Sequence, residues 1–203
     1  MRTGRLEAFS DGVIAIAITL MVLELPKPHG ATWLALRDDL PVLLAYLLSF
    51  VYLGIYWNNH HHMLAVSRRV NGTVLWANLH LLFWLSLVPF VTGWLSEQKN
   101  PEPVPVAVYG IVLLLAAVAF FLLRAALLRV HGGASRLSEA VGRDRKGTLS
   151  PVLYLVGILL SFVQPWLGLG VYALVALIWF VPDRRVERVV AQDHEEGLLR
   201  EER

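Results

Sequence analysis

The sequence predicts an all-α integral membrane protein with six transmembrane helices. Of its 203 residues, 56% are hydrophobic and only 17% are charged, whereas soluble domains average about 45–50% and 25%. The apolar residues also form long blocks. Blocks of roughly 18 or more residues with few charges are typical of helices that cross a bilayer core of about 30 Å.

Prolines and polar residues separate the blocks. Pro26 and Pro28 end the first, because proline lacks the amide hydrogen that continues a helix, and Pro41 is placed to begin the second. The prolines between Pro101 and Pro105 mark a short loop before the fourth. The predicted spans lie near 7–25, 41–65, 72–96, 104–128, 150–166 and 168–182.

The last two spans come from one uncharged stretch between Ser150 and Pro182, which Pro165 and Gly168 divide. Either a tight helical hairpin or one long kinked helix fits this pattern. About 33 residues exceed the roughly 20 that one crossing needs. Two short or tilted helices are therefore preferred.

The basic residues support six spans. Cytoplasmic loops collect Lys and Arg, and with six spans all 18 basic residues except Lys27, Arg37 and Lys99 fall on one side. We therefore expect a multi-pass protein of the cell (plasma) membrane with both termini in the cytoplasm. Residues 1–183 would form the transmembrane domain, and residues 184–203 a charged cytoplasmic tail.

Composition excludes several functions. The chain has no cysteine, so disulfides, thiolate metal sites and cysteine nucleophiles are absent. A formal charge of +2 gives no reason to expect a nucleic-acid partner. Three consecutive histidines, His60 to His62, diverge by about 100° per residue on a helix and cannot all reach one ion. We predict no enzyme activity, cofactor or metal site, although histidine leaves a pH-sensing role open.

The first span has two different faces. At about 100° per residue, one stripe carries mostly branched apolar side chains and a single hydroxyl, and Asp11 lies roughly opposite to it. We also expect this first block to remain in the mature protein and not to be a cleaved secretory signal, because Asp11 lies near its start and Glu24-Leu25-Pro26 ends it. The stripe consists of Phe9, Gly12, Ile16, Thr19, Leu20 and Leu23.

Asp11 needs partners, because a carboxylate within a span costs about 2.5–3.5 kcal/mol on insertion scales. Arg5 is poorly placed to pair with it, being about 240° around the helix. The predicted hydrogen-bond partners end the second span or begin the third: Trp57, Asn58, His61, His62, Asn78 and His80, with Asn59, His60 and Trp76 as further candidates.

Arg5, Phe9, Ser10 and Asp11 fill an Arg-x-x-x-Phe-Ser-Asp pattern. This segment resembles the signature of the transmembrane protein 175 family, lysosomal potassium channels and their bacterial relatives. The following residues 12–20 also agree, and residues 57–62 and 78–92 look similar to the family's second and third helices. The resemblance covers about the first 95 residues.

The resemblance implies one six-helix repeat that assembles as a homotetramer, with four first helices around a central potassium pore. Ile16, Leu20 and Leu23 would then form apolar rings with Thr19 hydroxyls between them. Such a hydrophobic constriction dewets and serves as gate and selectivity element. The permeant potassium ion would be the only ligand, and the signature residues would be the structural anchor.

A second hypothesis assigns the protein to another functional class, the transporters. Asp11 and the histidines could serve a proton-coupled transporter of small solutes or ions. Unitary currents that reverse near the potassium potential favour the channel, whereas saturable turnover tied to a proton gradient favours the transporter.

Overall fold

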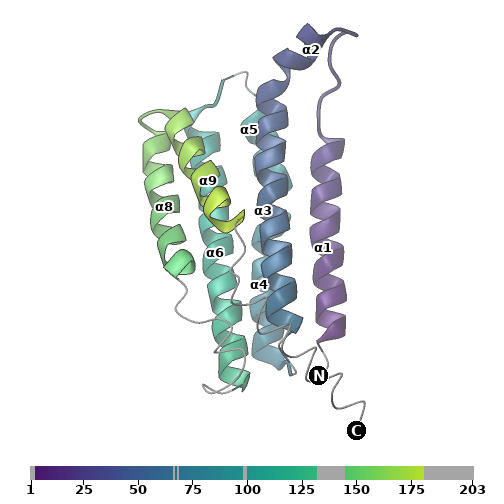
Figure 1. Cartoon of the computed structure of the whole chain (residues 1–203), viewed down its shortest axis with the longest axis vertical. Coiled ribbons are helices and arrows are strands. Elements are labelled where there is room, and N and C mark those ends of the chain that lie inside the picture. Colours follow the sequence, from purple (N-terminus) through teal and green to yellow (C-terminus); the bar gives the residue numbers. More distant parts are fainter. Residues whose placement is uncertain (1–2, 66, 68, 98–99, 132–144, 181–203) are drawn as a thin grey trace.

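The computed structural model describes residues 3–65, 67, 69–97, 100–131 and 145–180. Within these ranges the structure is all-helical, and its long helices run side by side, alternately up and down (Figure 1). The helices are α1 (Gly4–Leu23), α2 (Trp33–Asp38), α3 (Leu40–Ala65), α4 (Gly72–Ser86), α5 (Val88–Ser96), α6 (Pro103–His131), α8 (Arg145–Ser161) and α9 (Pro165–Phe180).

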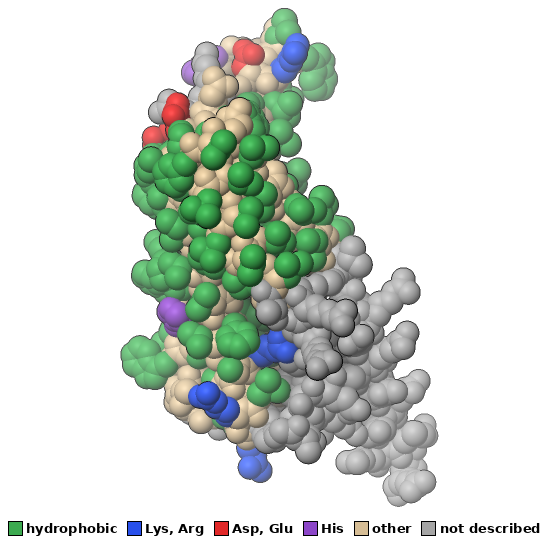
Figure 2. Space-filling view, turned by 90° about the vertical axis from the view of Figure 1, so that its left-hand side faces the viewer, with side chains coloured by type: hydrophobic (Ala, Val, Ile, Leu, Met, Phe, Trp, Pro, Cys, Tyr) green, Lys and Arg blue, Asp and Glu red, His purple; other side chains and the backbone are tan. Residues whose placement is uncertain are grey.

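The structure contains helices that can span a membrane. Within the described ranges, four segments are long and apolar enough to cross a bilayer: Gly4–Leu23, Leu40–Ala65, Gly72–Ser96 and Pro103–Val130. Leu149–Ser161 and Pro165–Phe180 are apolar but shorter. Hydrophobic side chains dominate the described surface in the face shown in Figure 2, and acidic side chains gather at one end of it. The predicted tail at 184–203 lies outside the described residues.

Two helix boundaries differ from the predicted ranges for a local reason. The predicted span 72–96 is divided at Leu87, because Pro89 cannot donate to the Leu85 carbonyl and its ring crowds that carbonyl. Pro165 begins α9, the position in a helix that proline favours. The stretch after Ser150 is accordingly a helical hairpin, with α8 packed on α9.

The short helix α2 was not predicted. Thr32 caps it by accepting a hydrogen bond from the Ala35 amide at 3.3 Å. Six residues are too few for a hydropathy pattern to detect, and all of Trp33–Asp38 is exposed or half-buried.

Buried polar contacts join the helices of the core. The Ser49 hydroxyl of α3 lies 2.7 Å from the Thr92 hydroxyl of α5 and 3.0 Å from the Tyr109 hydroxyl of α6. The Tyr52 hydroxyl donates to the Tyr172 carbonyl of α9 at 2.6 Å. By contrast, α1 lies at the edge of the bundle, packed against α3, α4 and α5 (Figure 1). One long face of α1 is therefore uncovered.

Candidate ion pathway along the first helix

The uncovered face of α1 is the apolar stripe. Its six residues are all exposed, with Ile16 at 60% and Leu23 at 78%. We call it the open stripe: Phe9, Gly12, Ile16, Thr19, Leu20 and Leu23. The buried residues of α1 recur every three or four positions on a different face, as Leu6, Ser10, Ile14, Ala17 and Met21. The sequence thus gives α1 two faces, of which the subunit covers one.

Thr19 is the only polar side chain on the open stripe. Its hydroxyl oxygen lies 2.6 Å from the Ala15 carbonyl oxygen and 3.0 Å from that of Ile16. Because these carbonyls can only accept, the hydroxyl hydrogen points back to the helix. The oxygen is then left to act as an acceptor on the exposed side.

Ser10 is the centre of the buried face. It is fully buried, its hydroxyl donates to the Leu6 carbonyl at 2.8 Å, and it accepts from the Asn78 amide nitrogen of α4 at 3.0 Å. The Asn78 amide oxygen in turn lies 2.7 Å from His60 Nε2 of α3. Since an amide oxygen can only accept, this nitrogen carries the hydrogen. One chain of hydrogen bonds therefore connects α1 with α4 and α3.

His60 was a further candidate and proves to be at the end of this chain. Its side chain is 1% exposed, and its Nδ1 is buried without a hydrogen-bond partner among the described residues. With Nε2 protonated, Nδ1 holds the lone pair of a neutral ring. Nothing in the described part of the chain satisfies that lone pair.

Two acids lie on the border between the faces. Asp11 is half-buried and accepts from Trp57 Nε1 at 3.0 Å, and one turn earlier Glu7 lies 2.8 Å from His61 Nδ1. The Trp57 and His61 rings stack with centroids 6.0 Å apart. Asp11 therefore contacts α3, but the fully buried face that we expected around it is centred on Ser10.

Glu7 was missed by the sequence reasoning. A usable signal existed, because Glu7 and Asp11 are four residues apart, as are Trp57 and His61. Residues at this spacing share one helix face. Two such pairs on neighbouring helices can meet as two rungs of one ladder, as they do here.

The remaining predicted partners do not reach Asp11. The His62 ring packs against His61 at 5.7 Å, and His80 Nε2 accepts from Trp84 of its own helix at 2.9 Å. The side chains of Asn58 and of the exposed Arg5 make no hydrogen bond within the described ranges. No three His, Asp or Glu side chains there are grouped so that they could hold a metal ion.

Comparisons with known proteins identify the family. A model of the endosomal/lysosomal potassium channel TMEM175 family matches residues 5–89. A protein of Chryseobacterium sp. (strain P1-3) named as a potassium channel is 50% identical over 193 residues, which are 95% of this chain and 100% of that relative. The chain belongs to the TMEM175 family.

The similarity to the TMEM175 family extends to the three-dimensional fold. The crystal structure of a lysosomal potassium-selective channel TMEM175 homolog from Chamaesiphon minutus has a TM-score of 0.76 and 34% identity, covering 88% of this chain and 96% of that one. A vertebrate relative, the endosomal/lysosomal proton channel TMEM175 of Gallus gallus, is 31% identical over 58% of this chain but only 26% of its own length.

Proposed function

We propose that this protein is a potassium-selective cation channel of the plasma membrane. Four copies would place their α1 helices around a central pore, with the open stripe as its wall and both termini in the cytoplasm. In this arrangement α8 and α9 also cross the membrane, which gives six helices per subunit. The observation that carries the proposal is the open stripe, an uncovered apolar face with one hydroxyl, in a chain whose full-length relatives are named potassium channels.

The chemistry of the open stripe suits a hydrophobic gate. Rings of Ile16, Leu20 and Leu23 offer no oxygen to replace the water around an ion, so a narrow ring dewets and blocks conduction. Displacement of α1 widens the ring and admits water. In this arrangement the Thr19 oxygens are the side-chain ligands in the constriction, between the Ile16 and Leu20 levels.

The proposal is tested with purified protein in planar bilayers under a potassium gradient with sodium opposite. We expect unitary currents whose reversal potential follows the potassium gradient. Proton flux without potassium current would instead support the second candidate, a proton channel, which is favoured by the vertebrate relatives that are named proton channels. Saturable turnover driven by a proton gradient would support the proton-coupled transporter.

The gate itself is tested by shortening the ring. Ile16→Ala or Leu23→Ala should raise unitary conductance or lower potassium over sodium selectivity by about twofold or more, because each removes apolar bulk from the constriction. Phe162→Ala is the control, since Phe162 is a similarly exposed apolar residue on the distant α8 hairpin end. Unchanged currents in both α1 variants would show that the open stripe does not line the pore.

A further inference from the structure

Arg124 is an unusual residue for a spanning helix, because it lies well inside its span. Among the described apolar helices the other basic side chains, Arg5 and Arg129, are next to a span end. The span Pro103–Val130 has 28 residues, so it is about 42 Å long and exceeds a hydrocarbon core of about 30 Å by roughly 6 Å at each end. Arg124 is about 9 Å from Val130 and thus about 3 Å inside the hydrocarbon. A charge at this depth marks a site that needs a partner.

The half-buried Arg124 side chain lines a cavity of about 50 Å³ between α3, α6, α8 and α9. Contacts join its walls. The Tyr56 ring of α3 meets the Phe120 ring of α6 edge-on with centroids 6.0 Å apart, and Trp179 Nε1 of α9 donates to the Ser150 hydroxyl of α8 at 2.7 Å. In Figure 1, α6, α8 and α9 lie on the side of α3 away from α1. In the proposed channel this cavity would therefore be remote from the pore.

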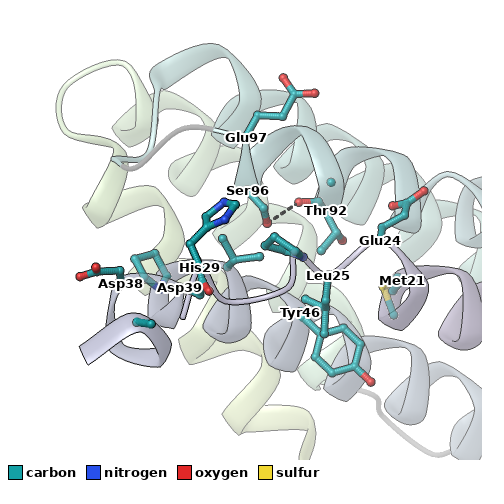
Figure 3. A pocket seen from close by; sticks show the side chains of 15 residues that line it. Met21, Glu24, Leu25, His29, Asp38, Asp39, Tyr46, Thr92, Ser96 and Glu97 are labelled. Carbon is teal, nitrogen blue, oxygen red and sulfur yellow. Dashed lines mark hydrogen bonds between the residues drawn. The ribbon is translucent and has the colours of Figure 1, made fainter. Parts of the chain in front are cut away.

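The cavity carries a positive charge. Arg124 lines it, and no Asp or Glu does so among the described residues. A larger cavity of about 500 Å³ at the end of α1 has the opposite character, because Figure 3 shows the acidic side chains of Glu24, Asp38, Asp39 and Glu97 around it. An anion would be repelled from the acidic cavity and attracted to the one at Arg124.

The cavity at Arg124 has room and donors for one phosphate group. At roughly 10–15 Å³ for each water-sized group, its 50 Å³ holds about four, which is comparable to the oxygens of one phosphate. A guanidinium has five donors in a fork that matches phosphate, so Arg124 can bind one in addition to its other contacts. Asn59 of α3 donates one amide hydrogen to the Ile55 carbonyl at 2.8 Å and has a second amide hydrogen for a ligand.

Phe121 makes a phospholipid the fitting source of that phosphate. It lines the cavity yet is 62% exposed, so the lining extends to the surface along which acyl chains would lie. Basic pockets between spanning helices on the cytoplasmic side bind anionic headgroups, and the long stem of Arg124 lets its charge reach the headgroup level. A zwitterionic headgroup would also bring an ammonium group, for which no described lining residue offers a carboxylate.

We propose that this cavity binds the phosphate of an anionic phospholipid from the leaflet at the Arg124 end, which is the cytoplasmic leaflet in the proposed orientation. Arg124 of α6 and Asn59 of α3 hold the phosphate, and the acyl chains pass outward over Phe121. The lipid thus links two helices through one ligand. Lipid binding requires no ion flow, so this proposal and the channel proposal can fail separately.

The first experiment measures which lipid the protein retains. Protein reconstituted in vesicles of equal parts phosphatidylglycerol and phosphatidylcholine is extracted in mild detergent and analysed by native mass spectrometry. Wild type should retain phosphatidylglycerol over phosphatidylcholine by about threefold or more, and Arg124→Gln should retain both equally. Arg129→Gln should behave like wild type, because Arg129 is an exposed arginine of the same helix outside the lining.

Inorganic phosphate distinguishes a lipid site from a site for the free anion. Bound phosphatidylglycerol should remain on the wild type when inorganic phosphate is added in large excess, because its acyl chains make contacts that phosphate lacks. Displacement of the lipid by inorganic phosphate would assign the cavity to the free anion and overturn the lipid proposal.

A second experiment uses the wild type and does not depend on the folding of a variant. Phosphatidylglycerol with a photoreactive group on its headgroup should label peptides within 117–124 or 147–154, which line the cavity. Phosphatidylcholine with the same group should label them less. The site is overturned by any of three results, whatever currents the protein carries: equal lipid retention by wild type and Arg124→Gln, labels confined to other segments, or equal labelling by the two lipids.

Discussion

Ser10 determines which face of the first helix meets the protein. It has no surface exposure, and its hydroxyl both donates to Leu6 and accepts from Asn78. A small hydroxyl is suited to this position because it donates its hydrogen bond to a carbonyl of its own helix and still lets α4 approach closely. Ser10 shares the buried face of α1 with Leu6, Ile14, Ala17 and Met21, and the open stripe lies on a different face.

Asn78 should be the costliest polar residue to lose in this region. Asn78→Leu keeps the side chain's approximate volume but leaves the His60 Nε2 hydrogen unpaired in the core. We expect the free energy of unfolding in detergent to fall by about 1–3 kcal/mol, measured by thermal denaturation. Asn59→Leu is the matched control, because among the described residues Asn59 donates only to Ile55 of its own helix. Equal losses in both variants would contradict the role of the buried chain.

Thr19 allows a test that separates permeation from stability. Thr19→Val keeps the shape and removes the oxygen, so the potassium over sodium permeability ratio should fall by about twofold or more. Thr19→Ser, which keeps an oxygen able to bond back to Ala15, should retain the ratio. Reversal potentials under mixed potassium and sodium measure both. An unchanged ratio in Thr19→Val would remove Thr19 from the selectivity element.

The candidate site was predictable where it follows helical spacing. The open stripe follows from the period of α1 alone, because its residues recur on one side of the wheel. Which neighbour each polar residue meets does not follow, since that depends on how α3 and α4 rotate against α1. For this reason the donor to Asp11 lay among the predicted partners, while the contact of Glu7 and the place of His60 at the end of the buried chain did not emerge.

At the scale of elements, glycines allow α6, α8 and α9 to pack closely around the aromatic ring of Tyr172. A Cβ on Gly110 of α6 or Gly157 of α8 would collide with the Tyr172 ring of α9. A Cβ on Gly168 of α9 would come within 2.9 Å of the Gly157 carbonyl oxygen. These close approaches allow two short helices to pack tightly on a long one.

Gly110→Ala should therefore destabilise this half of the bundle. The added methyl overlaps Tyr172 and also approaches Ile158, so we expect a loss of about 1–3 kcal/mol in the free energy of unfolding. Gly170→Ala is the control, because nothing lies within 4 Å of its added Cβ and alanine favours a helix by about 0.5–1 kcal/mol. Thermal denaturation of both variants should move in opposite directions.

The sequence predicts the long helices well and the short ones poorly. Hydropathy detects a span because a bilayer requires a long apolar block. It does not detect the α4 to α5 break, although Pro89 was a local signal for it. It also misses α2, whose Thr32 cap and six residues leave no periodic pattern.

For the whole molecule, the edge position of α1 makes assembly part of the proposed function. A pore requires the open stripes of several copies to face one axis. Leu23 is 78% exposed at the end of this stripe, and an isolated subunit would leave it against lipid. In the proposed assembly the same surface would form the wall of the pore, whereas in a monomer it would be ordinary membrane surface.

Introduced cysteines can tell these states apart. In Leu23→Cys, copies that meet at the axis bring thiols close enough to bridge, which requires Cα atoms about 4.4–6.8 Å apart. Oxidation in the membrane should convert most of the protein to covalent dimers on a denaturing gel. Leu159→Cys changes a similarly exposed leucine on α8. It should give only the background level of covalent dimer. Stronger bridging at position 159 would place the axis elsewhere.

The hydrocarbon character of the open stripe also has a thermal consequence. In the proposed channel, opening the constriction would wet Ile16, Leu20 and Leu23 in every subunit, and hydrating apolar surface raises the heat capacity. The enthalpy of opening must then increase with temperature. A plot of the logarithm of the open-to-closed ratio against inverse temperature should curve, and shortening the stripe with alanines should straighten it.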